Sequence, residues 1–155
     1  MEKSRSIRQA KDERAFHIFY QLLAGASPEQ RKEFILEDPK TYSFLSHGSL
    51  PVAGVDDVAE FQQTCKSMFI MGLNQEDLSP LFRIVSATLL FGNMKFKQDR
   101  NSDQATLPDN TVAQKIAHLL GLSVTDMTKA FLKPRIKVGR DYVTKAQTKE
   151  QVRIS

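Results

Sequence analysis

The stretch Lys133-Pro-Arg-Ile-Lys-Val-Gly-Arg-Asp-Tyr-Val-Thr-Lys145 alternates basic and apolar residues on both sides of Gly139. This period of two is typical of a half-exposed pair of strands. Tyr142 and Val143 favour a strand, and Gly139 with the two residues after it supplies turn chemistry. Pro134 biases the residue before it away from the helical conformation, so a preceding helix must end there. The sequence predicts a short, exposed, basic β-hairpin.

The composition indicates a soluble globular domain. The chain has 155 residues, of which 41% are apolar and 26% charged, ordinary values for one such domain. No apolar run approaches the ~20 residues of a membrane span, and the N-terminus has no apolar core of a signal peptide. The single cysteine, Cys65, cannot form an internal disulfide, which fits a reducing cytosol. Its helical, apolar surroundings predict a buried small hydrophobe rather than a nucleophile.

The net charge of +4 is concentrated at the C-terminal end. From Lys129 onward there are eight basic and two acidic residues, a surplus of six, which leaves about −2 for the first 128 residues. Such an end suggests an acidic partner, either a filament, a nucleic acid or a membrane face. A solvated basic surface without a partner is an equal alternative from charge alone.

Apolar residues at helical spacing predict about six helices, one short strand and the hairpin, a mainly α (α+β) fold. The expected helices are one capped by Asp12, one from Ser27 to about Leu36, one from Asp57 to Gly72, one from Pro80 to Phe91, one capped by Asn110, and one from Ser123 to the hairpin. Thr148–Gln151 resembles the opening of another. Met94–Lys97 is the expected strand, with Phe96 inward, followed by a polar loop from Gln98 to Asn110.

Pro80 allows two boundaries for the strongest apolar face, which carries Leu78, Leu81, Phe82, Val85 and Leu89. If Asn74 is the cap, the proline lies inside the helix at a cost of roughly 3 kcal/mol. If Ser79 is the cap, the proline takes the favoured first helical position. We prefer the second boundary, with a short turn over Gln75–Leu78.

Long segments of the chain resemble class II myosin heavy chains. Pro134–Gln151 resembles the cardiomyopathy loop of that family, and four upstream segments resemble the same motor head in the same order: Glu2–Arg5, Asp12–Tyr20, Phe82–Ser86 and Leu107–Thr111. The resemblance is greatest to the non-muscle and smooth-muscle type. It implies that residues 1–152 are part of a myosin motor domain, in its upper central subdomain, whereas residues 153–155 depart from the family pattern.

The resemblance implies a larger P-loop motor head that hydrolyses ATP with Mg²⁺. Such a head uses a phosphate-binding loop, Gly-x-x-x-x-Gly-Lys-Ser/Thr, and two switch segments. The sequence contains none of these, and by resemblance it begins just after the first switch and stops before the second. We therefore expect no catalytic, cofactor or metal residues in this chain and no ATP turnover by it alone.

The implied partners are F-actin and the remainder of the myosin head, in the cytoplasmic actin cytoskeleton and not at a membrane. In related motors the cardiomyopathy loop contacts actin, which implies these contact residues: Lys133, Arg135, Ile136, Lys137, Val138, Arg140, Asp141, Tyr142 and Lys145. The polar loop before the fifth helix matches the myosin loop 4, which implies a secondary contact at these residues: Lys97, Asp99, Arg100 and Asn101. Without the resemblance, the sequence alone favours a mobile connector for this loop.

Several alternatives stay open at this point. Ile136 and Val138 also suit the inner face of a hairpin, and Asp141 also suits a turn. The chain itself also fits a truncated gene product without independent function. A small helical module that binds nucleic acid is less favoured, because Tyr142 is its one candidate stacking group near the basic residues.

Overall fold

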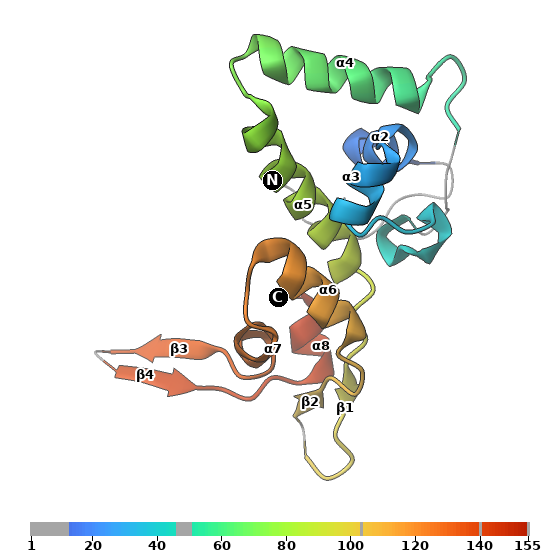
Figure 1. The fold of residues 1–155 in the computed structure, drawn as a ribbon. Helices are drawn as coiled ribbons and strands as arrows, with labels where there is room; N and C mark the ends of the chain where they lie inside the picture. The colour runs from blue at the N-terminus through green and yellow to red at the C-terminus, as the bar shows by residue number, and fades with distance from the viewer. Residues whose placement is uncertain (1–12, 46–50, 103, 140, 155) are drawn as a thin grey trace. The chain divides into compact units, whose positions relative to one another are not determined.

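The computed structural model describes residues 13–45, 51–102, 104–139 and 141–154 (Figure 1). Within these residues there are seven α-helices, two 3-10 helices and two antiparallel two-stranded sheets. This confirms the predicted mainly helical α+β fold. The chain divides into two compact units, Met1–Asn93 and Met94–Ser155, which are described separately below.

The first unit is helical where it is described. Its elements are α2 (His17–Gly25), α3 (Pro28–Glu33), the 3-10 helices η1 (Pro39–Thr41) and η2 (Ser43–Leu45), α4 (Asp57–Ile70) and α5 (Gln75–Phe91). The second unit contains β1 (Lys97–Gln98), β2 (Ala105–Thr106), α6 (Thr111–Leu120), α7 (Val124–Leu132), β3 (Arg135–Val138), β4 (Asp141–Thr144) and α8 (Lys149–Ile154). Thr148–Gln151 does open a helix, as predicted.

Phe82 of α5 lies at the centre of the core of the first unit. Its ring centroid is 6.0 Å from that of Phe34 and 5.2 Å from that of Phe61, both in tilted contacts. Leu22 and Leu78 complete this buried cluster. Each aromatic pair adds about 0.5–1.5 kcal/mol to the burial of its apolar area, so the cluster holds α2, α4 and α5 around the residue that follows α3.

The preferred boundary at Pro80 is wrong, because α5 begins at Gln75 and contains the proline. The Asn74 side chain accepts hydrogen bonds from the amides of Glu76 (2.8 Å) and Asp77 (3.1 Å), and the Asp77 carboxylate accepts one from the Asn74 amide (2.9 Å). This capping box and the burial of Leu78 offset the amide that proline cannot donate. Leu81, expected on the inner face, is exposed.

Helix α3 ends at Glu33, three residues earlier than predicted, because Ile35 adopts a left-handed conformation with φ 51°. The Ile35 amide donates to Lys32 O (3.2 Å) and the Leu36 amide donates to Arg31 O (2.9 Å), the paired bonds of a Schellman motif. Glycine usually occupies this position, so no glycine in the sequence signalled the end. A branched residue there costs roughly 1–2 kcal/mol.

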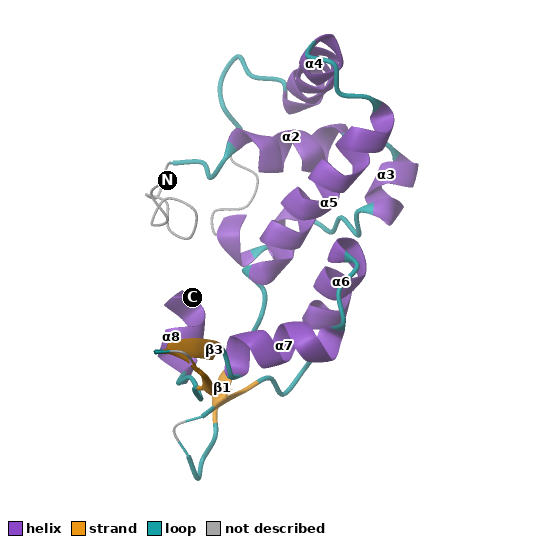
Figure 2. Cartoon of the chain, turned by 90° about the vertical axis from the view of Figure 1, so that its left-hand side faces the viewer, coloured by secondary structure: helices purple, strands orange, loops and turns teal. Residues whose placement is uncertain are grey.

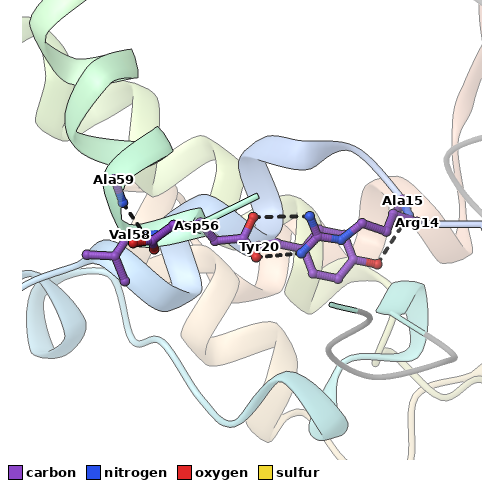
Figure 3. Close-up of polar contacts among 7 residues, drawn as sticks. Arg14, Ala15, Tyr20, Asp56, Val58 and Ala59 are labelled. Carbon is purple, nitrogen blue, oxygen red and sulfur yellow. Dashed lines mark hydrogen bonds and ion pairs between the residues drawn. The ribbon is translucent and has the colours of Figure 1, made fainter. Parts of the chain in front are cut away.

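A buried ion pair ties the segment before α2 to the start of α4 (Figure 3). Arg14 Nη1 and Nη2 donate to Asp57 Oδ1 and Oδ2 at 3.1 and 2.5 Å, and the guanidinium lies 3.9 Å from the centroid of the Tyr20 ring. The Tyr20 hydroxyl accepts from the Ala15 amide at 3.2 Å. Asp56, rather than Asp57, caps α4. The predicted cap Asp12 lies outside the described residues, and the helix begins later than expected, at His17 with Phe16 at the N-cap position.

Replacing Asp57 by alanine is expected to lower the free energy of unfolding by roughly 3 kcal/mol, because the Arg14 side chain is only 6% exposed and its charge would lose its partner. Urea denaturation followed by circular dichroism measures this change. As a control, Arg83→Ala breaks the ion pair with Glu33, whose side chains are 44% and 38% exposed, and should cost less than about 1 kcal/mol. Equal losses in the two variants would contradict the burial argument.

Gly25 ends α2 where Phe61 of α4 approaches closely, since an added Cβ would lie 2.6 Å from Phe61 Cβ. Gly25→Ala is therefore expected to lower the thermal unfolding midpoint, by an overpacking cost of about 1–3 kcal/mol. The neighbouring Ala24 is exposed, so Ala24→Ser should change stability by no more than about 0.5 kcal/mol. A stabilised Gly25→Ala variant would mean that helix propensity outweighs the contact.

Candidate functional site

Helices α6 and α7 directly precede the hairpin in the second unit, and β3 begins three residues after the end of α7. Gly121, with φ 66°, ends α6, and Ser123 caps α7 by accepting from the Asp126 amide at 3.3 Å. Met127 is the buried residue of α7. α7 continues to Leu132, where Pro134 prevents a further turn, as the sequence predicted.

The cap of α6 differs from the prediction. Asn110 precedes the helix as expected, but its side-chain oxygen accepts from Gln114 Nε2 at 3.0 Å. Asp109 binds the start of the helix instead, with its Oδ1 accepting from Thr111 Oγ1 at 2.7 Å and from the Thr111 amide at 2.9 Å. These two hydrogen bonds, the hydroxyl first, lower the pKa of Asp109.

The predicted basic hairpin is confirmed as β3 paired antiparallel with β4, and it extends away from the helices of its unit (Figure 1). Val138 pairs with Asp141, so the turn of the hairpin lies between these two residues and includes Gly139. Gly139 has φ 64°, the conformation such a turn requires. Asp141 is thus a strand residue and not a turn residue. Arg140 lies outside the described residues.

The strand register separates the hairpin into two faces. Ile136 is opposite Val143, and these residues are 43% and 52% exposed, so Ile136 does not lie on a buried inner face. Lys137 is opposite Tyr142 on the other face, which Arg135 and Thr144 share. This cationic face consists of Arg135, Lys137 and Tyr142.

Tyr142 is 59% exposed, and the Arg135 guanidinium lies 5.2 Å from its ring centroid. At such an exposed position a cation–π contact is worth about 0.5–1 kcal/mol. The contact gives the Arg135 side chain a preferred position, and the residue remains exposed. Sequence periodicity placed Arg135 and Lys137 together, but Tyr142 joins them only through the cross-strand register.

Backbone hydrogen bonds continue below the hairpin and anchor its base. The Lys145 amide donates to Pro134 O at 3.0 Å, and the Gln147 amide donates to Leu132 O at 3.1 Å. Lys133 and Lys145, the outermost predicted contact residues, are exposed at this base. The basic residues are therefore carried on a ladder that begins at the end of α7.

The secondary contact residues lie on a second, smaller turn. The expected strand at Met94–Lys97 is wrong by about three residues, because the ladder is Lys97–Gln98 paired with Ala105–Thr106. Phe96 is half-buried next to it. The Asp99 amide donates to Gln104 O at 2.9 Å, and Asp99 Oδ1 accepts from the Asn101 amide at 3.1 Å. Lys97, Asp99, Arg100 and Asn101 are all exposed on this β1–β2 turn.

The sequence pattern does not predict β2, because a strand of two residues is too short to show a periodic pattern. Ala105 is nevertheless buried and donates its amide to Gln147 O at 2.8 Å. The polar loop expected over Gln98–Asn110 is thus partly a strand that also contacts the segment after the hairpin. In the sequence, the small apolar residue Ala105 within a polar stretch was the one available sign of this strand.

The part of the chain that the structure describes holds no group of three or more His, Cys, Asp or Glu side chains arranged for a metal ion. No helix among those residues is long and apolar enough to cross a membrane. Cys65 is half-buried, and this burial raises the pKa of its thiol, which agrees with the predicted packing role.

Comparison with known proteins identifies the family. Residues 1–155 match the myosin head (motor domain). The chain belongs to the myosin head family. It is 80% identical over 152 residues to the "Myosin heavy chain, non-muscle" of Drosophila melanogaster, an alignment that covers 98% of this chain. The myosin head fragment spans 7% of the length of that relative. The predicted family is confirmed.

The turn of the hairpin depends on Gly139. Gly139→Val is expected to disrupt the β3–β4 register, because a β-branched residue at φ 64° is strained by at least about 1–2 kcal/mol. Loss of the nuclear Overhauser contacts between Ile136 and Val143 measures it. Gly139→Asn should keep them, since asparagine tolerates this conformation. Retention of the contacts in the valine variant would mean that the ladder, not the turn, sets the register.

Proposed function

We propose that the β3–β4 hairpin is a contact surface for an actin filament, within a fragment of a myosin motor head. The observation that carries this proposal is the cationic face, on which Arg135 and Lys137 lie beside an exposed Tyr142. An acidic protein surface is the complementary partner. Membership of the myosin head family makes a filament a better candidate than a nucleic acid.

The two faces of the hairpin support different parts of the binding energy. An exposed ion pair contributes about 0–1 kcal/mol and weakens with salt. Ile136 and Val143 are exposed apolar residues whose burial contributes about 25 cal/mol per Å² and persists at high salt. Attachment through the hairpin is therefore weak in isolation and mainly, but not wholly, electrostatic.

The β1–β2 turn is the proposed secondary contact. Lys97 and Arg100 are exposed cations on it, and Asp99 and Asn101 are linked by a hydrogen bond that shapes the turn. An acidic surface large enough to meet both turns would bind more tightly than either contact alone. Actin is the proposed partner here as well, together with the remainder of the head.

The proposed parent protein is an ATP-driven motor of the cytoplasmic actin cytoskeleton that uses Mg²⁺ with the nucleotide. These properties are proposals for the whole heavy chain, of which the fragment covers a small part. The sequence of the fragment lacks the phosphate-binding motif Gly-x-x-x-x-Gly-Lys-Ser/Thr, so its proposed contribution is binding and not hydrolysis.

Co-sedimentation of the folded chain with F-actin across a salt series tests the proposal. We expect pelleting that decreases with salt and falls about 3- to 10-fold in Arg135→Glu or Lys137→Glu, because each substitution reverses a charge on the cationic face. Ile136→Ser should instead reduce the part that persists at high salt.

Lys66→Glu is the matched control, because Lys66 is exposed on α4 in the other unit and the substitution changes the net charge equally. Equal losses in the control and the hairpin variants would reduce the binding to a net-charge effect. A folded chain that never pellets would overturn the proposal and favour a fragment without independent function. Charge-reversal effects on single-stranded nucleic acid but not on actin would favour the alternative module.

A further inference from the structure

Gln98 is an exposed residue whose side-chain amide binds two different elements. Its Nε2 donates to Ser102 O, within the β1–β2 turn, at 3.1 Å. Its Oε1 accepts from the Lys149 amide, at the start of α8, at 3.0 Å. Both polar atoms of one side chain are therefore used. The bond to Lys149 joins positions 51 residues apart in the sequence.

The α8 end of this link is itself fixed. The Thr148 amide donates to Gln151 Oε1 at 3.1 Å, and Thr148 Oγ1 accepts from the Gln151 amide at 3.3 Å, which together form a capping box. Val152, one residue later, is buried. Lys149 is thus the first residue of a capped and anchored helix, and the bond from Gln98 holds the β1–β2 turn to a fixed point.

Residues 145–149 connect this point to the hairpin. Gln147 donates its amide to Leu132 O at the end of α7 and accepts from the Ala105 amide of β2. Figures 1 and 2 show α8 beside the small sheet, and the return strand of the hairpin leading into it. The β1–β2 turn and the hairpin are therefore linked at their bases by the Gln147 backbone and by the Gln98 side chain.

We propose that Gln98 is a positioning residue that holds the β1–β2 turn and the hairpin in one fixed arrangement, so that they meet an acidic filament surface as one bipartite site. This inference rests on the function proposed above. The inference adds that the two turns act together. When one turn has bound, a fixed spacing raises the effective concentration of the other turn at its own contact. Gln98 itself makes no proposed contact with the partner.

Two substitutions at Gln98 separate its two bonds. Alanine removes both, whereas glutamate retains an oxygen that accepts from the Lys149 amide but has no amide to donate to Ser102 O. Thr106→Val is a matched control in the same small sheet, because it removes the hydrogen bond from Thr106 Oγ1 to Lys97 O and retains both hydrogen-bonding atoms of Gln98.

Amide hydrogen exchange of the full chain without any partner is the first test. In Gln98→Ala we expect the Lys149 amide to exchange roughly 5-fold faster, the effect of losing one hydrogen bond. In Gln98→Glu the Lys149 amide should stay protected while the Asp99 amide in the turn exchanges faster. Thr106→Val should leave Lys149 unchanged. Equal exchange of Lys149 in the wild type and Gln98→Ala overturns the positioning role.

The second test is a double-mutant cycle in actin co-sedimentation. Gln98→Ala is expected to weaken binding about 3- to 5-fold in the wild type and not at all in Arg100→Ala, where the contact that it positions has already been lost. An equal loss in both backgrounds overturns the bipartite arrangement. If the wild type does not pellet with actin, the proposed function and the bipartite site fail together, and the exchange experiment alone decides whether Gln98 positions the turn.

Discussion

The backbone of Gln147 joins the parts of the second unit. Its amide donates to Leu132 O at the end of α7 and its carbonyl accepts from the Ala105 amide of β2, so one residue links the base of the hairpin to both elements. A two-stranded hairpin is marginal by itself in water. Here the ladder continues below β3 and β4 into a base that α7 and β2 support. The hairpin can therefore project into solvent and still keep a defined register, which a contact surface requires.

The first unit depends on a different kind of constraint, the close packing of helices. Phe82 contacts Phe34 and Phe61, and the approach of Phe61 to Gly25 leaves no room for a larger residue. The ion pair of Arg14 and Asp57 is largely buried, with side chains 6% and 18% exposed. Because water has little access to these side chains, removing one partner leaves the other charge uncompensated and lowers the stability of the fold.

In the hairpin, the strand register decides which side chains lie together on each face. Period-two alternation places Arg135 and Lys137 on one face, but it does not say which residue of the return strand joins them. The two-residue turn brings Tyr142 opposite Lys137 and within 5.2 Å of the Arg135 guanidinium. One residue more in the turn would have placed the exposed apolar residue Val143 there instead.

The sequence by itself determined the features that act over a few residues. It identified the family, the start of a helix at Ser27, the ends of helices at Gly72 and Pro134, and the basic hairpin around Gly139. Only the tertiary structure decided the others. Pro80 lies inside α5 because the Asn74 capping box and the burial of Leu78 outweigh its local preference. Ala105–Thr106 forms a strand because Lys97–Gln98 lies beside it. Gln98 reaches Lys149 across 51 residues. Caps and turns depend on near neighbours, whereas burial and strand pairing depend on partners that no local pattern specifies.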